Sequence, residues 1–430
     1  MSWRNWGGTA SCEPTVLARP ETEADLRELV ASSVDAGDTV RIVGSGHSFT
    51  GLVPTDDVLL SLERFTGVVA VDRDAEEVTV RAGTTLATLN RELADHGLAM
   101  ANLGDIDRQT IAGAVGTGTH GTGLDFGTLS SQVVGCRLVT ADGSVHELDA
   151  DGDSTLFEAA RVSLGALGVL STVTLSVVPA YDLRLRREAR PLDAVLTDVD
   201  RYHTDHDQWE FFWFPHTDTA LVKTYDRKPA GTGDPGTGRF DTLGDRVENA
   251  AWETICRVGT HAPVTAPTGA KLAAATLSDK TEVGPSYEVF ANAREVRFSE
   301  MEYGVPADEV VPVVRRIRAI ADGDRHVQFP VEVRFVGGDQ PLLSPAHARD
   351  SAFVAVHTYH RKAYREYFDR CEAVFREFGG RPHWGKLHTA DAATLAERYP
   401  RWDAFQSVRR ELDPDGAFLN EHLRDVFGVE

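Results

Sequence analysis

The stretch Arg41-Ile-Val-Gly-Ser-Gly-His-Ser-Phe49 and the later stretch Gly113-Ala-Val-Gly-Thr-Gly-Thr-His-Gly-Thr-Gly123 decide the fold of this chain. The first continues a β-type run, 39–43, and the second holds five glycines and three threonines in eleven residues. Such segments pack side chains poorly, but they bring backbone N–H groups and hydroxyls close to an anionic ligand. Both therefore favour a phosphate-bearing ligand over the alternative of two glycine-rich turns in a sheet protein.

The common nucleotide-binding motifs fit neither stretch. A Rossmann fingerprint needs glycine at position 49, where this chain has Phe49. A Walker A motif is missing too, since Gly385-Lys386 is followed by Leu387. A lone G-x-G is weak evidence, so the indication of a bound phosphate comes from the pairing of the two glycine-rich segments.

Strand and helix signals alternate through residues 1–180. Apolar spacing and breaker residues predict helices over 21–36 and 85–96 and short strands over 39–43, 58–62, 67–71 and 77–82. The runs 133–140 and 144–148 flank Ala141-Asp142-Gly143 and predict a hairpin. Beyond residue 180 the pattern changes to charged or aromatic strands at 183–187, 209–214, 331–336 and 353–359, with a helix over 310–322.

Composition excludes several classes of protein. The 430 residues carry 44 basic and 66 acidic side chains, a formal net charge of −22, so a nucleic-acid partner is not expected. The N-terminus has no apolar signal segment, and the charge-free stretch Val162–Tyr181 alternates like a buried strand, so we expect no membrane-spanning segment. The four cysteines are scattered, which predicts a reducing, cytoplasmic location without disulfides.

Several motifs together resemble one flavoprotein superfamily. V-G-S-G-H-S-F (43–49), N-L-G-D-I-D-x-Q-T-I-A-G-A (102–114) and G-T-G-T-H-G-T-G (116–123) are similar to the vanillyl-alcohol-oxidase type, and within it to the sugar-lactone and alditol oxidases. The strings V-E-V-R-F-V (331–336), H-W-G-K (383–386) and D-P-D-G-x-F-L-N (413–420) resemble the same group. The likeness spans the chain but is loose over 182–325.

This resemblance implies an α+β fold with three parts. A two-subdomain α/β FAD-binding domain of the vanillyl-alcohol-oxidase (PCMH) type is expected over 1–180. A substrate cap domain with a large antiparallel sheet flanked by helices is expected over 181–378, and the segment 379–430 should return to the flavin side. The cofactor would be FAD, tethered covalently through His47, because neutral imidazole is a good nucleophile.

The resemblance also assigns cofactor contacts along the chain. The expected FAD-binding residues are Val43, Gly44, Ser45, Gly46, His47, Ser48, Gly104, Asp105, Thr110, Gly113, Gly116, Thr117, Thr119, His120, Val169 and His383. Asp105 departs from the group, since alditol oxidase has a serine there. A carboxylate at this position would favour neutral, hydroxyl-rich substrates and repel acids.

Glu332 and Arg334 are the candidate catalytic pair. Because they are two apart on a predicted strand, their side chains share one face, with the apolar residues on the other. The alternative is a solvated face with a mild ion pair. The resemblance aims both at a substrate hydroxyl near the flavin, beside Asp105. It adds Lys386, one of six lysines, as a cation near the reduced ring, and His357 and Tyr359 as substrate contacts.

A metal site is not expected. The histidines of His357-Thr-Tyr-His360 are three apart on a strand and would point to opposite faces.

The expected function is that of an FAD-dependent oxidase of the CH–OH group of a sugar lactone or alditol. Hydride would pass to flavin N5, and O₂ would reoxidise the flavin to give H₂O₂. The proton acceptor is left open between Glu332 and Lys386. Two alternatives remain: a dehydrogenase that uses a quinone or cytochrome, and a flavin- or carbohydrate-binding protein without turnover.

Overall fold

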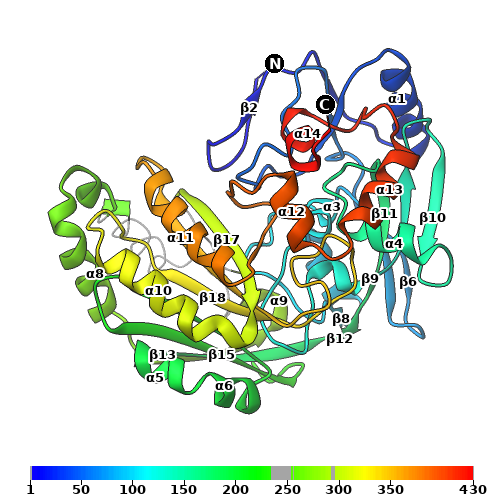
Figure 1. Cartoon of the computed structure of the whole chain (residues 1–430). Coiled ribbons are helices and arrows are strands. Elements are labelled where there is room, and N and C mark those ends of the chain that lie inside the picture. The colour runs from blue at the N-terminus through cyan, green and yellow to red at the C-terminus, as the bar shows by residue number, and fades with distance from the viewer. Residues whose placement is uncertain (1, 234–252, 255, 292–295, 430) are drawn as a thin grey trace.

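A computed structural model describes residues 2–233, 253–254, 256–291 and 296–429 (Figure 1). The N-terminal part is built from small sheets with helices around them, and one large sheet with helices forms the other side of the molecule (Figure 1). The architecture is the expected α+β fold with a large antiparallel sheet.

A three-stranded parallel sheet carries the first glycine stretch. Its order is β3 (Val16–Ala18), β5 (Val58–Ser61) and β4 (Val40–Val43). Helix α1 (Glu23–Asp35) begins at a capping box in which the Thr22 side chain accepts from the Asp25 amide. Strand β4 ends at Val43, so the chain enters the glycine segment at the edge of a buried sheet.

A five-stranded antiparallel sheet forms the second half of the N-terminal part. Its order is β10 (Val145–Asp149), β9 (Val133–Val139), β11 (Val169–Ser176), β7 (Glu77–Arg81) and β6 (Val68–Asp72). The expected β9–β10 hairpin is confirmed, and Gly143 in its turn has a φ of 74°. The remaining elements of this part are β1 (Trp3–Arg4), β2 (Ser11–Cys12), α2 (Leu86–Asp95), β8 (Leu98–Ala99), α3 (Ile111–Gly116), η1 (Leu129–Gln132), α4 (Ser154–Arg161) and β12 (Val178–Pro179).

The large sheet has eight strands, each antiparallel to its neighbours. In order they are β16 (Lys280–Pro285), β13 (Tyr181–Pro191), β15 (Thr219–Pro229), β14 (Gln208–Trp213), β18 (Val331–Val336), β19 (Ser351–Tyr359), β17 (Phe298–Pro306) and β20 (Arg381–Pro382). The predicted strand 331–336 is β18, and the predicted helix 310–322 is α10 (Val310–Asp322). The other elements of this region are α5 (Leu192–Thr197), α6 (Val199–Asp205), η2 (Pro263–Thr265), α8 (Ala266–Ala275), α9 (Ser286–Phe290), η3 (Ala307–Glu309) and α11 (Arg365–Glu377).

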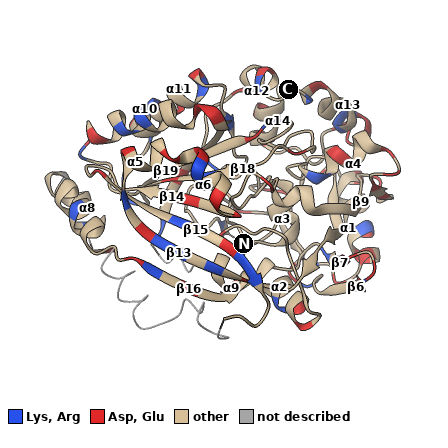
Figure 2. Cartoon of the chain, turned by 90° about the horizontal axis from the view of Figure 1, so that it is seen from below, with Lys and Arg blue, Asp and Glu red and all other residues tan. Residues whose placement is uncertain are grey.

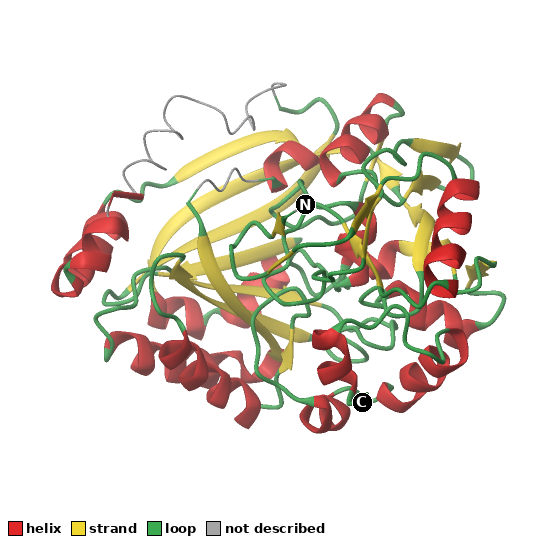
Figure 3. Ribbon diagram, turned by 90° about the horizontal axis from the view of Figure 1, so that it is seen from above, coloured by secondary structure: helices red, strands yellow, loops and turns green. Residues whose placement is uncertain are grey.

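One face of the large sheet packs on helices, as Figure 3 shows from above. Val331, Val333 and Phe335 of β18 join a buried cluster with apolar residues of α5, α10 and α11. Alternate residues of the same strands face the N-terminal part instead. The buried apolar layer therefore fixes which side chains of β14 and β18 point toward the glycine stretches.

The C-terminal helices pack back on the N-terminal part. They are α12 (Ala392–Arg398), α13 (Trp402–Leu412) and α14 (Glu421–Phe427), and their apolar residues share one core cluster with α1 and both small sheets. Arg41 of β4 helps to hold this arrangement. Its guanidinium donates to the carbonyls of Gly165 (2.9 Å) and Phe418 (2.5 Å), so it ties three distant segments together.

Within the described residues, no helix is long and apolar enough to span a membrane. The stretch 162–181 forms a loop and the buried strand β11, as predicted. Strands β13, β15 and β16 carry both signs of charge (Figure 2). Cross-strand ion pairs such as Arg187–Glu282 (2.8 Å) balance them, and no basic stripe results among these pairs.

Candidate active site

The two glycine stretches line one open cavity of about 910 Å³. Its walls come from the end of β4, from α3 and from the turn before β11, and they include Val43, Gly44, Ser45, Gly46, His47, Ser48, Thr110, Gly113, Gly116 and Thr117. These walls come from three separate segments of the chain, so the cavity can contact an elongated ligand at several points rather than a single small ion.

The backbone of this cavity fits a phosphate-bearing cofactor. Within the described chain, the amide N–H groups of residues 44–48 have no hydrogen-bond acceptor. Gly46 has a φ of 69°, and a Cβ at Gly44 would stand 2.4 Å from Oγ1 of Thr110. Several amides of the cavity lining thus have no acceptor in the described chain, and free backbone amides of this kind can bind pyrophosphate.

A second cavity of about 610 Å³ adjoins the first and shares His47, Ser48, Gln109 and Thr117 with it. Its other walls come from the N-terminal part, from β17 and β18 and from the segment 383–386. They include Gly104, Asp105, Thr119, His120, Glu300, Glu302, Arg334, His383 and Lys386. A large cofactor in the first cavity can therefore extend one end against charged residues of the large sheet.

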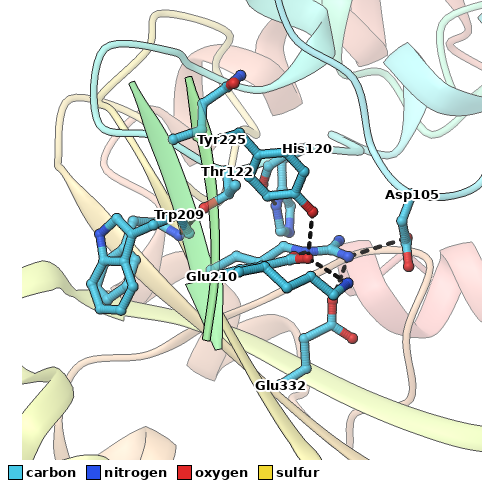
Figure 4. A network of polar contacts seen from close by, with 12 residues as sticks. Asp105, His120, Thr122, Trp209, Glu210, Tyr225 and Glu332 are labelled. Carbon is cyan, nitrogen blue, oxygen red and sulfur yellow. Dashed lines mark hydrogen bonds and ion pairs between the residues drawn. The ribbon is translucent and has the colours of Figure 1, made fainter. Parts of the chain in front are cut away.

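Arg334 pairs with three acids of the charged wall, Asp105, Glu210 and Glu332, which are labelled in Figure 4. Its Nε donates to Glu210 at 2.8 Å, and its Nη2 lies 3.2 Å from Asp105 and also pairs with Glu332. Burial alone would lower the pKa of Arg334, but the three carboxylates outweigh it and raise that pKa well above its ordinary value. Glu332 is 3% exposed and Arg334 8%, which rules out a solvated face.

Lys386 forms the second cationic point of the wall. Its Nζ pairs with Glu300 of β17 and lies 5.4 Å from the centre of the Phe49 ring. Burial would raise the pKa of Glu300, but Lys386 and His357 hold it well below its usual range. Glu300 is therefore an anion that keeps the Lys386 ammonium beside the cavity.

His357 lies behind the cavity wall rather than in it. Its Nδ1 donates to the Pro330 carbonyl (3.1 Å), while Nε2 lies 3.4 Å from Glu300 and 4.0 Å from Glu332. The ring thus links the carboxylate beside Lys386 to the carboxylate beside Arg334.

His120, Glu302 and His383 form a buried group whose ligand atoms lie within 4.8 Å of one another. His120 Nε2 is 3.3 Å from Glu302, and His383 Nδ1 accepts the Gly385 N–H at 3.0 Å. Burial lowers the pKa of His383 to about 3, so the ring is neutral and carries its proton on Nε2. That proton occupies the atom a metal would need, and the group as built favours hydrogen bonding over metal binding.

His47 lines both cavities and stacks on Trp6, with ring centres 5.9 Å apart. Burial, together with Lys386 and Arg108, lowers the pKa of His47 to about 4. The imidazole is therefore neutral near pH 7, the form that acts as a nucleophile.

Four of the residues expected at the site do not line either cavity. Glu332 and His357 lie directly behind the wall, in contact with Arg334 and Glu300. The side chain of Val169 packs in the core, and its neighbours Gly168 and Leu170 line the cavity instead.

Tyr359 lines neither cavity, although its expected role is that of a substrate contact. Its ring packs with Phe49, Phe298 and Phe329, and its hydroxyl donates to Glu253 at 2.5 Å. The ring of Tyr359 thus belongs to this apolar cluster, and its expected role as a substrate contact stays a prediction.

Sequence reasoning missed Glu210, Lys223, Glu300 and Glu302, all of which lie in the region of loose resemblance. Glu300 and Glu302 alternate with apolar residues on β17, the same two-residue spacing that singled out Glu332 and Arg334. That spacing was a usable signal. Glu210 sits in an aromatic run, Trp209–Trp213, where no pattern indicates which face the carboxylate takes.

Comparison with known proteins agrees with this geometry. The family model for D-arabinono-1,4-lactone oxidase matches residues 173–426, and an FAD binding domain model matches residues 14–149. The chain belongs to the D-arabinono-1,4-lactone oxidase family. Membership and the FAD-binding match make it an FAD-dependent oxidoreductase, as the motifs indicated.

Several curated relatives of this lactone oxidase family member are similar over their whole length. An L-gulono-1,4-lactone dehydrogenase of Mycobacterium tuberculosis is 42% identical, with 99% of both chains covered. The L-gulonolactone oxidase of Mus musculus is 31% identical over 99% of this chain and 98% of its own. An alditol oxidase of a Streptomyces species is 31% identical over 98% of each.

Among solved structures, a cholesterol oxidase from Brevibacterium sterolicum superposes with a TM-score of 0.85. It is 17% identical and covers 99% of this chain and 96% of its own, so it shows the shared fold alone.

Proposed function

We propose that this lactone oxidase family member oxidises a CH–OH group of an aldono-1,4-lactone or an alditol, with O₂ as electron acceptor and H₂O₂ as product. The observation that carries the proposal is Arg334, which lines a cavity that adjoins the glycine-lined one and is flanked there by Asp105 and Lys386. Names of the relatives point to the same substrates. Free cysteines fit a cytoplasmic protein.

FAD fits the first cavity, where Val43 to Ser48, Thr110, Gly113 and Thr117 would hold its phosphates and ring; when bound, it supplies the hydride acceptor. His47 is neutral and lines both cavities, which supports a covalent link from its ring to the flavin. Because His47, Ser48, Gln109 and Thr117 line both cavities, the cofactor's phosphates would lie in the first cavity and its reactive edge would reach the second.

The residues of the second cavity have separable roles. Arg334 orients the reacting hydroxyl and offsets negative charge that develops on its oxygen. Lys386, held as a cation by Glu300, stabilises negative charge gained on the cofactor side of the cavity. The proton acceptor stays open between Glu332 and Lys386, because Glu332 lies behind the cavity wall in an ion pair with Arg334 and Lys386 is paired with Glu300.

A dehydrogenase is the second candidate, because the relative at 42% identity carries that name. Both candidates share the reductive step and differ only in what reoxidises the cofactor. The acceptor therefore needs its own measurement.

In the test, purified protein is mixed anaerobically with a panel of aldonolactones and alditols, and the flavin's absorption of blue light is followed. Bleaching of the flavin by a lactone or an alditol supports the proposal. If no compound of the panel bleaches the flavin, turnover of these substrates is rejected. Admission of air then decides the acceptor. Stoichiometric peroxide identifies an oxidase, whereas slow reoxidation with fast reduction of a quinone or dye identifies a dehydrogenase.

A further inference from the structure

Three charged side chains form a row across the large sheet beneath the second cavity. Lys223 on β15 stands directly opposite Glu210 on β14, and Glu210 stands directly opposite Arg334 on β18. Directly opposed residues of antiparallel strands point to the same face, so the three side chains project together toward the N-terminal part. All three are buried, with Glu210 2% exposed.

Glu210 has both of its oxygens engaged, as Figure 4 shows in part. Oε2 accepts the Nε–H of Arg334 at 2.8 Å. Oε1 accepts from Nζ of Lys223 at 2.8 Å and from the hydroxyl of Tyr225 at 2.9 Å. Burial would raise the pKa of Glu210, but Lys223 and Arg334 outweigh it and lower that pKa to about 2.

The contacts of Arg334 use only part of its guanidinium. Nε is bound to Glu210, and Nη2 lies between Asp105 and Glu332. Among the described residues, Nη1 has no hydrogen-bond or ion-pair partner, although Arg334 lines the second cavity. A planar guanidinium fixed at Nε and Nη2 has no rotational freedom left, so the direction of Nη1 is set by its two anchored nitrogens.

Lys223 completes the charge balance of the row. The Arg334 guanidinium pairs with three carboxylates, those of Asp105, Glu210 and Glu332, and Lys223 adds a second cation beside Glu210. Lys223 is 8% exposed, and its Nζ lies 4.4 Å from the centre of the Phe212 ring, so water screens its charge weakly. Lys223 thus allows Glu210 to remain an anion behind the cavity wall.

We propose that Glu210 is a positioning residue for Arg334. The Glu210 carboxylate binds the Nε edge of the guanidinium on the side away from the second cavity. This contact directs the Nη1 donors into that cavity, toward the substrate hydroxyl. Lys223 and Tyr225 act through Glu210 by saturating its other oxygen. This inference rests on the proposed function, and it assigns a role to residues that contact neither the cofactor cavity nor the substrate cavity.

Glu210→Gln tests the proposal because it keeps the side-chain shape and removes the charge. The holoenzyme variant should retain its flavin spectrum and its rate of reoxidation by O₂, while the limiting rate of anaerobic flavin reduction falls about 10- to 100-fold, the cost of a misplaced positioning group. Glu282→Gln is the matched control. It removes another carboxylate paired with an arginine, Arg187, on the same sheet but outside both cavities, and should leave flavin reduction unchanged.

A double-mutant cycle separates positioning from general structural damage. If Glu210 acts through Arg334, Glu210→Gln should cost little more once Arg334→Lys is present. Tyr225→Phe is the milder second variant, in case Glu210→Gln does not fold, and it should slow reduction about 2- to 5-fold for the loss of one hydrogen bond.

Reduction of Glu210→Gln and Tyr225→Phe at the wild-type rate would overturn the inference, as would full additivity with Arg334→Lys. Failure of the proposed function gives a different result, since no lactone or alditol would then reduce the flavin of the wild-type protein. In that event a crystal structure of Glu210→Gln decides the inference alone: a rotated Arg334 supports it, and an unmoved guanidinium contradicts it.

Discussion

Nη2 of Arg334 lies 3.2 Å from Oδ1 of Asp105, which joins the large sheet to the N-terminal part across the second cavity. Arg334 is on β18, and Asp105 is in the loop that follows β8. The contact closes one side of the cavity with a carboxylate whose neighbours are also anions, namely Glu332 and Glu210. The wall is thus rich in acids, and its cations are already paired.

Asp105→Ser should broaden the substrate range toward acids. The carboxylate repels a negatively charged ligand a few ångströms away by about 1–4 kcal/mol, which corresponds to roughly 10-fold or more in relative binding. We expect the ratio of kcat/KM for a hydrolysed aldonate over its neutral lactone to rise about 10-fold. The comparison uses steady-state kinetics at one ionic strength. An unchanged ratio would show that Asp105 does not screen substrate charge.

His47→Ala should abolish covalent flavin attachment. Wild-type protein is expected to keep its yellow colour in the pellet after acid precipitation, whereas the variant should release its flavin to the supernatant. Since His47 has a pKa of about 4, the link should form at neutral pH without assistance from another base. Release of colour from wild-type protein would mean that the flavin is held without a covalent bond.

Lys386→Met should slow flavin reduction about 10²- to 10³-fold, the usual cost of removing one group that stabilises developing charge. Stopped-flow absorbance under anaerobic conditions measures this rate directly. The control is Lys280→Met on β16, an exposed lysine whose side chain is 61% accessible. Equal rates in Lys386→Met and the control would remove Lys386 from the chemistry.

Acid should destabilise the protein through two histidines that line neither cavity, His388 and His422. Burial, and after it the nearby His422, lowers the pKa of His388 to about 4. Burial, and after it the nearby Arg41, lowers the pKa of His422 to about 4. Both rings are neutral in the folded state, while the unfolded chain binds their protons below about pH 6.5. Stability is therefore lost as the pH falls from about 6.5 toward 4, by about 3 kcal/mol per ring at the lower end.

Urea unfolding of the holoenzyme across this pH range checks the prediction. His388→Gln should flatten the slope of unfolding free energy against pH, because the substituted side chain does not titrate. His96→Gln, at the exposed end of α2, provides the surface control. A slope unaffected by His388→Gln would show that this ring is already protonated in the folded protein.

The fold was largely predictable because its signals are local. The glycine stretches, the hairpin at Asp142-Gly143 and the alternation in 331–336 each depend on a few neighbouring residues, and all are found in the structure. The placement of Glu332 and Arg334 on one face followed from strand periodicity alone.

The rest of the site depends on strand order, which no local pattern encodes. Glu210 reaches Arg334 only because β14 pairs with β18, and Glu300 reaches Lys386 only because β17 lies beside the segment 383–386. The surroundings of Tyr359 could not be predicted for a related reason. Its neighbours Phe49 and Phe298 come from distant segments, so no local pattern in the sequence indicates the apolar cluster that contains its ring.

The most direct test of the account compares anaerobic bleaching of wild-type and Arg334→Met holoenzymes by a reactive lactone or alditol. The account predicts that both proteins are yellow, that the wild type bleaches fully, and that the variant bleaches at least about 100-fold more slowly. A colourless wild type, or a variant that bleaches at the wild-type rate, would contradict the claim that β18 presents Arg334 to a substrate beside the bound flavin.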